Sequence, residues 1–202
     1  MVVNSSMVKY YYEFSVLCRF RRAILGFLSQ LFKRASVSAS ETPVDNIQAD
    51  FSLFAPVSGT LLPLEEVPDI VISEKVMGEG VAVVPESETI VAPCDGVISR
   101  LLPTKNAFAV RMAEGLEVYV TFGVESMELK GEGFVTKVNL GDEVKKGDPI
   151  IITDPRLLSN RLKSTITSMI VIKSSIDLER VTNASGKCLA GHTPVLWISL
   201  KK

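Results

Sequence analysis

The sequence predicts an all-β domain at residues 51–202, built as a duplicated barrel-sandwich-like β-sandwich with short helices. Runs of Val, Ile and Leu are interrupted by Gly and Pro at intervals of roughly ten residues, which is typical of sandwiches and barrels of short strands. The segment 55–61, Ala-Pro-Val-Ser-Gly-Thr-Leu, also returns as 92–98, Ala-Pro-Cys-Asp-Gly-Val-Ile. Each copy is expected to form a strand, a proline-initiated turn with glycine at its tight position, and a second strand. The repeat therefore predicts an internal duplication.

Two further features fit this architecture. Residues 141–150, Gly-Asp-Glu-Val-Lys-Lys-Gly-Asp-Pro-Ile, have the pattern of a hairpin found in lipoyl- and biotinyl-type barrels. Only two segments of the body have a helical pattern, 70–76 and 155–163; in the second, Asp154 can cap the helix and Pro155 can occupy its first position. Both segments are too short to organise the core, which is therefore expected to consist of strands.

Composition and charge divide the chain into a basic arm and an acidic body. The 202 residues are 47% hydrophobic and 22% charged, which suits one folded domain with an appendage and is unlike a disordered chain. The net charge of −1 hides an excess of +5 in residues 1–40, which leaves −6 for the rest. A basic arm suggests an anionic surface as its target and a different partner for the body.

Residues 1–34 are predicted to form a basic amphipathic helix on an anionic membrane surface. Apolar side chains recur at three- and four-residue steps, and the apolar run 23–32 is too short to span a bilayer. Two alternatives remain open: a helix packed on the domain, and a cleaved signal peptide, although Lys33 and Arg34 argue against cleavage. Residues 35–50 are expected to be a flexible linker. The residues expected at the membrane are Arg19, Phe20, Arg22, Ile24, Phe27 and Lys33.

Cysteine and histidine usage excludes several classes of site. The three cysteines are widely spaced without a Cys-x-x-Cys pair, so neither a disulfide framework nor a zinc knuckle is indicated, and no metal or cofactor is expected. His192 is the only histidine, which excludes a zinc endopeptidase with a duplicated barrel. A biotinyl or lipoyl carrier needs a lysine at a hairpin tip, and the residues around Lys75 do not match. A reducing cytoplasm is the simplest location.

The most informative stretch is 115–134. It begins as an alternating strand, with the apolar side chains of positions 116, 118 and 120 on one face and Glu117, Tyr119 and Thr121 on the other. We expect the strand to break at the Phe-Gly pair that follows Thr121. The chain is then expected to turn at Gly-Glu-Gly, residues 131–133, before the next strand.

This stretch closely resembles the active-site strand of the glucose-type IIA domain of the bacterial phosphoenolpyruvate-dependent sugar phosphotransferase system. The resemblance runs from residue 51 to the C-terminus, and the N-terminal helix fits as well, because glucose-type IIA proteins carry one that touches anionic lipid. It implies a IIA domain at 51–202. The motifs that carry it lie at 55–59, 67–71, 74–80, 92–96, 128–134 and 191–195.

The resemblance also locates a loss of chemistry. The family works with two histidines, one that accepts the phosphoryl group and one that supports the transfer; the matching positions here are Thr121 and Asn106. Imidazole is a good nucleophile near neutral pH, whereas an asparagine amide is not, and a phosphothreonine ester is too stable to pass the group on. His192 lies in a turn remote from these strands in the sequence. Both positions are therefore expected to be inactive.

The resemblance still predicts that the protein binds partners. In the family an apolar patch with an acidic rim docks the histidine-bearing carrier protein, the sugar permease and regulated enzymes. The matching residues are Asp69, Ile70, Val71, Phe108, Phe122, Glu125 and Glu128; Phe108, Phe122 and Val71 are alternatively core residues, and the two glutamates a solvated rim. Nucleic acid is not expected as a partner.

These observations favour a regulatory IIA-like protein over an enzyme. It would be cytoplasmic, peripheral at the inner membrane face, and permanently similar to unphosphorylated IIA. One alternative is a functional IIA phosphocarrier in sugar transport that uses His192 or another acceptor. A further alternative is a stable paralogue that has no partner left.

Overall fold

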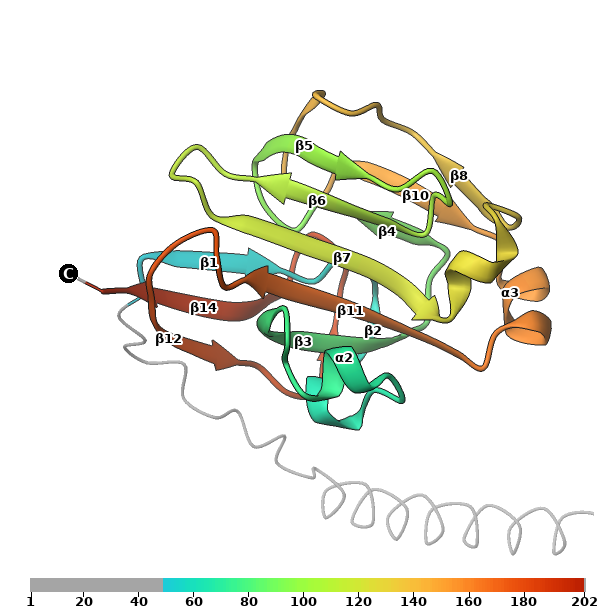
Figure 1. Ribbon diagram of the computed structural model, residues 1–202, viewed down its shortest axis with the longest axis horizontal. Helices are drawn as coiled ribbons and strands as arrows, with labels where there is room; N and C mark the ends of the chain where they lie inside the picture. Colours follow the sequence, from blue (N-terminus) through green and yellow to red (C-terminus); the bar gives the residue numbers. More distant parts are fainter. Residues whose placement is uncertain (1–48, 202) are drawn as a thin grey trace, which may run out of the picture. The chain divides into compact units, whose positions relative to one another are not determined.

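The computed structural model describes residues 49–201, and this part of the chain is built mainly from antiparallel β-strands (Figure 1). Residues 1–48 and 202 lie outside the described part. The predicted helix and nearly all of the predicted linker therefore remain predictions, and so do the membrane roles of Arg19, Phe20, Arg22, Ile24, Phe27 and Lys33. No helix within residues 49–201 is long and apolar enough to cross a membrane.

Three sheets form the β-sandwich, which confirms the predicted fold class. The largest has the order β13 (Lys187–Cys188), β2 (Gly59–Pro63), β3 (Gly78–Pro85), β11 (Ser164–Ile172), β7 (Glu117–Val124), β6 (Ala107–Arg111), β5 (Gly96–Leu101) and β9 (Glu143–Val144). The two smaller sheets are β1 (Phe51–Phe54), β14 (Pro194–Leu200), β12 (Leu178–Asn183) and β4 (Thr89–Val91), β10 (Pro149–Thr153), β8 (Phe134–Thr136). The helical segments are η1 (Leu64–Glu66), α2 (Ile70–Ser73), η2 (Ser126–Leu129) and α3 (Pro155–Arg161).

The sheets have a pseudo-two-fold arrangement, which agrees with the predicted duplication. On the two sides of the central β11–β7 pair, the strands of the large sheet occupy equivalent positions: β3 corresponds to β6, β2 to β5, and β13 to β9. The sheet β1-β14-β12 likewise matches β4-β10-β8. The register follows the same rule, because Gly59 pairs with Cys188 where Gly96 pairs with Val144. The sequence repeat therefore corresponds to a structural repeat.

Close approach of a neighbouring strand explains the glycine in each copy. A Cβ atom on Gly59 would lie 2.0 Å from the carbonyl oxygen of Val84, and one on Gly96 would lie 2.4 Å from that of Arg111. Any side chain at these positions would push β2 away from β3, or β5 away from β6. The same steric constraint therefore acts in both halves.

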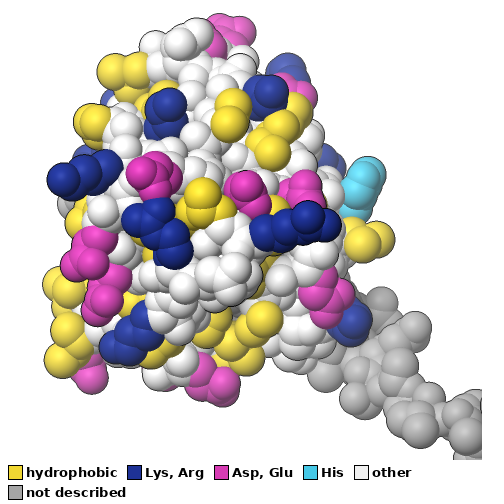
Figure 2. Space-filling model, turned by 90° about the vertical axis from the view of Figure 1, so that its right-hand side faces the viewer, with side chains coloured by type: hydrophobic (Ala, Val, Ile, Leu, Met, Phe, Trp, Pro, Cys, Tyr) yellow, Lys and Arg dark blue, Asp and Glu magenta, His cyan; other side chains and the backbone are white. Residues whose placement is uncertain are grey.

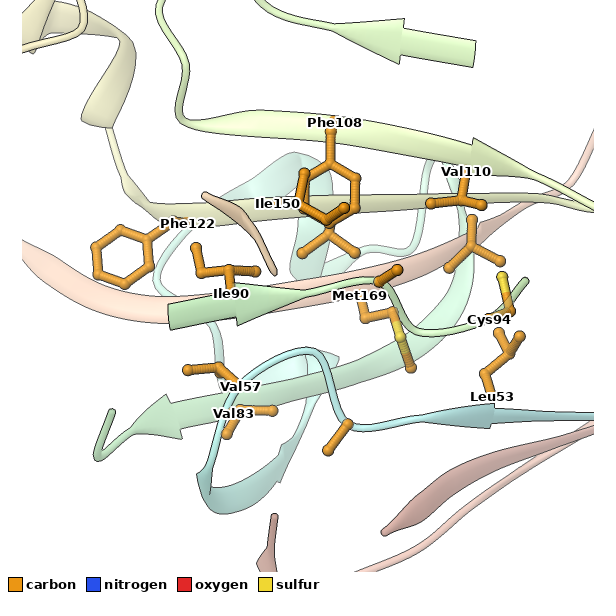
Figure 3. Close-up of a cluster of buried hydrophobic side chains, with 14 of the residues drawn as sticks. Leu53, Val57, Val83, Ile90, Cys94, Phe108, Val110, Phe122, Ile150 and Met169 are labelled. Carbon is orange, nitrogen blue, oxygen red and sulfur yellow. The ribbon is translucent and has the colours of Figure 1, made fainter. Parts of the chain in front are cut away.

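Strand β7 alternates as predicted, and its inner face belongs to the hydrophobic core. Val118, Val120 and Phe122 are at most 3% exposed, whereas Tyr119 and Thr121 on the outer face are partly exposed. The core fills the space between the large sheet and the two small sheets (Figure 3). Strand β7 thus separates a core face from a face that can carry a site.

Phe108 and Phe122 lie in this core, which corrects the prediction that they meet a partner. Phe108 on β6 has no exposed surface, and Phe122 is 3% exposed. Figure 3 shows both side chains in the buried cluster, and the Phe122 ring packs edge-on against Phe134 with ring centroids 5.7 Å apart. Burial of each ring stabilises the fold by about 1.5–3 kcal/mol.

The short helix α2 begins where the sequence predicts and ends earlier than residue 76. The Asp69 carboxylate caps it by accepting hydrogen bonds from two backbone N–H groups of the first turn. The helix ends at Ser73, and Lys75 then adopts a left-handed backbone with φ of 51°. The Lys75 ammonium bridges Glu65 and Glu79, each 2.8 Å away, which holds this loop against η1 and β3.

Two other local predictions agree with the structure, whereas the predicted hairpin at residues 141–150 is wrong, because β9 pairs with β5 and β10 pairs with β4 and β8. Pro155 is the first residue of α3, and the Asp154 carboxylate caps its first turn. The chain turns at residues 131–133 directly before β8. On the outer face, apolar side chains of η1 and α2 pack over β3, β7 and β11 in a second cluster formed by Leu64, Val67, Ile72, Ala82, Val124 and Ile170.

The predicted break after Thr121 is a β-bulge rather than the end of the strand. Strand β7 continues through Phe122 and Gly123 to Val124, while its register with β11 shifts at this point. Gly123 has φ of +72°, a conformation that side-chain-bearing residues rarely adopt. The strand ends at Val124, and the next residue, Glu125, is also left-handed.

A buried carboxylate links three strands at the other end of β7. Glu117 is 5% exposed; its Oε1 accepts hydrogen bonds from Ser99 Oγ at 2.7 Å and Arg100 Nε at 3.1 Å, and its Oε2 lies 3.5 Å from Arg111 Nη2. Burial raises the pKa of this carboxyl, but the Ser99 hydroxyl and the two guanidinium groups outweigh burial and hold the pKa below its ordinary value. Glu117 is therefore ionised at neutral pH.

We expect Glu117→Gln to lower the free energy of unfolding by about 1–3 kcal/mol at neutral pH, because a neutral amide cannot pair with two guanidinium groups. The folded-state pKa of Glu117 is lowered, so its contribution is complete above the ordinary carboxyl pKa and is lost as the pH falls through the folded-state value. The difference between wild type and variant should therefore shrink below about pH 4.

Urea denaturation of wild type, Glu117→Gln and the exposed control Glu143→Gln across this pH range measures the effect. Equal destabilisation by the two substitutions, or a difference that does not change with pH, would contradict the assignment.

Candidate functional site

A pocket of about 330 Å³ opens on the outer face of the large sheet. It lies between α2, η2 and strands β7 and β11. It brings the two predicted degenerate positions, Thr121 and Asn106, together with Asp69, Val71 and Glu125 from the predicted binding surface. Residues distant in the sequence thus meet where the family resemblance predicts a site.

Thr121 lies on the outer face of β7 in the middle of the large sheet. It pairs across the strands with Ala107 of β6 and Ser168 of β11. Tyr119, two residues earlier, lies on the same face, and both residues line the pocket. Burial raises the pKa of the Tyr119 phenol, and its interactions with Thr121 and Arg100 oppose this only in part. Thr121 therefore lies beside a neutral phenol in the pocket.

Asn106 is buried at 3% exposure and serves as a connector. Its Oδ1 accepts a hydrogen bond from Thr104 Oγ1 at 2.6 Å, and its Nδ2 donates to Ser126 Oγ at 2.8 Å. Ser126 Oγ in turn donates to the carbonyl of Phe122, whose N–H donates to the carbonyl of Asn106 at 2.9 Å. The amide thus ties the loop before β6 to η2.

The rim of the pocket is apolar with acidic groups. Ile70 is 76% exposed, Val71 45% and Met127 59%, although all three side chains are apolar. Glu125 and Glu128 are exposed beside Met127. Figure 2 shows the side of the molecule that carries α3, where exposed hydrophobic side chains lie among acidic and basic ones. Such a mixed rim is typical of transient protein interfaces.

Backbone strain is concentrated in the loops around this pocket. Lys75, Lys105, Glu125 and Lys130 are the non-glycine residues with positive φ within the described part of the chain. Lys105 directly precedes Asn106, Glu125 lines the pocket, Lys130 ends η2, and Lys75 follows α2. A left-handed non-glycine residue costs about 1–3 kcal/mol and occurs preferentially at functional sites.

His192 lies in an exposed turn before β14 and is not among the residues that line the pocket. Its neighbour Gly191 donates its N–H to the carbonyl of Ala55 at 2.8 Å, which anchors this turn to the loop after β1. Among residues 49–201, no group of three or more His, Cys, Asp or Glu side chains is placed to hold a metal ion.

Comparison with known proteins places this chain in a family. The model of the family "phosphoenolpyruvate-dependent sugar phosphotransferase system, EIIA 1" matches residues 51–176. The chain belongs to this family. A glucose-specific EIIA component of the phosphotransferase system from Haemophilus influenzae is 42% identical over 158 residues, which cover 78% of this chain and 93% of that protein.

Two further similarities bear on the EIIA assignment. An N-acetylglucosamine-specific EIICBA component from Klebsiella pneumoniae is 34% identical over 167 residues, covering 83% of this chain and 26% of that protein. The structure of glucose permease IIA from Mycoplasma capricolum superposes with a TM-score of 0.67 at 28% identity, covering 72% of this chain and 94% of that chain. The EIIA fold is therefore shared over the described body.

The pocket includes some of the predicted residues and leaves others out. Ile70 and Glu128 are exposed near it but do not line it, and Phe108 and Phe122 are buried beneath it. Sequence reasoning missed Tyr119, Ser126, Met77 and Met127, which all line the pocket. The strand alternation could have indicated Tyr119, which shares a face with Thr121, whereas nothing in the sequence pattern indicated the bond between Ser126 and Asn106.

We expect Asn106→Ala to lower the free energy of unfolding by about 1–3 kcal/mol, because the buried hydroxyl of Ser126 loses its donor and the loop before β6 loses its link to η2. In a double-mutant cycle with Ser126→Ala the two losses should be non-additive, with a coupling of about 0.5–3 kcal/mol.

Denaturant unfolding of the two single variants and the double variant gives the coupling directly. The control is Asn139→Ala, because Asn139 is an exposed asparagine that follows β8 in the sequence. Simple additivity of Asn106→Ala and Ser126→Ala would contradict the connector role.

Proposed function

We propose that this chain is a IIA-type binding and regulatory protein of the sugar phosphotransferase system that does not carry phosphate. It permanently resembles the unphosphorylated form of its relatives. One observation carries the proposal: Thr121 and Asn106 occupy the pocket positions where the resemblance predicts the phosphoryl-accepting and the supporting histidine.

The chemistry of the two side chains supports this proposal. A phosphocarrier needs a nucleophile that is active near neutral pH and whose phosphoryl bond remains labile, and a neutral imidazole meets both needs. The Thr121 hydroxyl is weakly nucleophilic and would form a stable ester. The Asn106 amide is bound on its oxygen by Thr104 and on its nitrogen by Ser126. Neither group is suited to phosphoryl transfer.

The architecture around the pocket supports retained binding. The apolar side chains of Ile70, Val71 and Met127 are exposed together with the acidic rim residues Glu125 and Glu128. The Asp69 carboxylate fixes the start of α2, and with it the first two of these apolar side chains. Partner classes follow from the family: the histidine-bearing carrier protein, the sugar permease or enzymes regulated by unphosphorylated IIA. The Klebsiella relative is named an EIICBA component, and this name indicates that its IIA part belongs to the same protein as other components of the system.

The location is part of the same proposal. The protein acts in the cytoplasm, at the inner face of the membrane, where residues 1–34 lie on anionic lipid. The support is the sequence pattern of this segment, with its apolar stripe and its excess of basic residues.

The alternative is a functional IIA phosphocarrier. It is favoured by the 42% identity to the Haemophilus glucose-specific EIIA component over almost all of that protein's length. On this view the phosphoryl group is accepted by His192 or by another side chain. The position of His192 in a turn outside the pocket argues against it.

We expect incubation with phosphoenolpyruvate, enzyme I and the histidine-bearing carrier protein to leave the wild-type chain without acid-labile phosphate. The double variant Thr121→His/Asn106→His should approach about one labile phosphate per chain, because imidazoles return to a pocket that is otherwise formed. Mass spectrometry at neutral and acidic pH measures both. Labelling of the wild type that disappears in His192→Ala would establish the alternative and overturn the proposal.

We expect Val71→Asp and Met127→Asp each to weaken the affinity for the unphosphorylated carrier protein about tenfold or more, because each places a charge in the apolar part of the docking surface. Leu189→Asp is the matched control, since Leu189 is 63% exposed but lies in the segment before the His192 turn. Titration calorimetry measures all three. An equal loss in the control, or no loss at positions 71 and 127, would contradict the docking surface.

A further inference from the structure

Two arginines lie on the outer face of the large sheet, and the proposed docking function does not use them. They are Arg100 of β5 and Arg111 of β6, and both contact the buried carboxylate of Glu117 on β7. Figure 1 shows these three strands side by side in the upper half of the large sheet. The cluster lies toward the start of β7, and the pocket lies toward its end.

The local strand geometry explains why the two arginines converge. The pairing of β5 with β6 shifts between Ile98 and Arg100, and this bulge lets Ser99 and Arg100 both reach the same carboxylate oxygen. Arg111 stands directly opposite Glu117 in the β6–β7 ladder. Ala109, which pairs with Arg100 and is fully buried, adds little bulk between them.

The cluster carries an excess of positive charge at an accessible surface. The side chains of Arg100 and Arg111 are 62% and 57% exposed, whereas that of Glu117 is 6% exposed. Two guanidinium groups face one carboxylate, and no other acidic side chain within the described residues forms an ion pair with either arginine. Arg100 contacts Glu117 through its Nε, and Arg111 contacts it through its Nη2. The other N–H groups of both guanidinium groups can therefore donate to a ligand from solvent.

We propose that Arg100 and Arg111, oriented by Glu117, form a binding site for a phosphate group, either the free ion or the phosphate of a small monoester. A tetrahedral oxyanion suits this arrangement because it can accept hydrogen bonds from two guanidinium groups at once and neutralises the excess charge. Glu117 orients the guanidinium groups of both arginines, each of which presents a fork of N–H donors, before the ligand binds. This orientation reduces the entropic cost of binding.

The surroundings favour a site that is stable at neutral pH and separate from the docking surface. The hydrogen bond from Ser99 and the two arginines keep the pKa of Glu117 low despite its burial, so the carboxylate persists as the orienting group. The positive charge of Arg100 also acts on the Tyr119 phenol, which lines the pocket beside Thr121. A bound phosphate would therefore lie near the pocket wall without occupying the apolar rim at Val71 and Met127.

Nuclear magnetic resonance of the full-length chain tests the site with two probes, inorganic phosphate and glucose 6-phosphate, at an ionic strength held constant with sodium chloride. The side-chain Nε–H resonances of Arg100 and Arg111 should shift in a saturable way with phosphate and not with chloride. Arg111→Gln should weaken binding about tenfold or more, because one of the two forks is removed. Tighter binding of the ester would identify a small monoester as the ligand, and equal binding would identify the phosphate group alone.

Two further variants keep the test decisive. Arg180→Gln, an exposed arginine on β12, is the control and should bind like the wild type. Arg111→Lys retains the charge without the fork and should bind between the wild type and Arg111→Gln, and thermal unfolding confirms that each variant is folded. No saturable shift of either arginine, or equal affinity in Arg111→Gln and wild type, would overturn the proposal whatever the outcome for the docking surface.

Discussion

The pairing of β7 with β11 at the centre of the large sheet is the interaction on which the rest of the structure depends. Across this pair Val120 faces Met169, and Thr121 faces Ser168. Because strand side chains alternate, a shift of one residue would bring the inner-face residues of β7 to the outer face and Thr121 into the core. The register therefore places the hydrophobic core on one side of β7 and both candidate sites on the other. The two pseudo-equivalent halves of the sandwich also meet here.

The part of the fold that follows from period and glycine placement could be predicted from the sequence. The alternation along β7 was visible in positions 116–121, and the duplication was visible in the return of segment 55–61 as 92–98. The structure shows that Gly59 and Gly96 in this repeat occupy equivalent steric positions against neighbouring strands. The start of α3 was indicated by Asp154 and Pro155, since these side chains act within one turn of their own backbone, whereas the cap that Asp69 forms on α2 was not predicted.

Interactions that depend on the tertiary arrangement could not be predicted in the same way. The bond between Asn106 and Ser126 joins two segments that β6 and β7 separate in the sequence, so no local pattern indicates it. Phe108 and Phe122 were assigned to a partner surface through the resemblance, yet their strand positions place them inside, with exposures of 0% and 3%. A family resemblance indicates which segments surround a site, whereas the alternation of side chains along a strand decides which side of the sheet each one occupies.

The polar side chains of Asn106 and Ser126 in the pocket already have hydrogen-bond partners within the protein. Asn106 and Ser126 are hydrogen-bonded to each other, and Ser126 also donates to the carbonyl of Phe122, so hydrogen bonds in this region stabilise the loops. The rim nevertheless keeps exposed apolar side chains and left-handed residues such as Lys105 and Glu125, which are costly arrangements for a merely structural surface. The physical account that joins these facts is a site that binds partners without phosphoryl chemistry.

That account is tested most directly by the affinity of the full-length chain for the cytoplasmic domain of a sugar permease, before and after incubation with phosphoenolpyruvate, enzyme I and catalytic carrier protein. The Haemophilus EIIA component treated in parallel shows that the mixture is active. The proposal that Thr121 takes no part in the relay predicts an affinity for this chain that is unchanged within about twofold. A clear change in affinity after incubation, accompanied by phosphate on the chain, would contradict it.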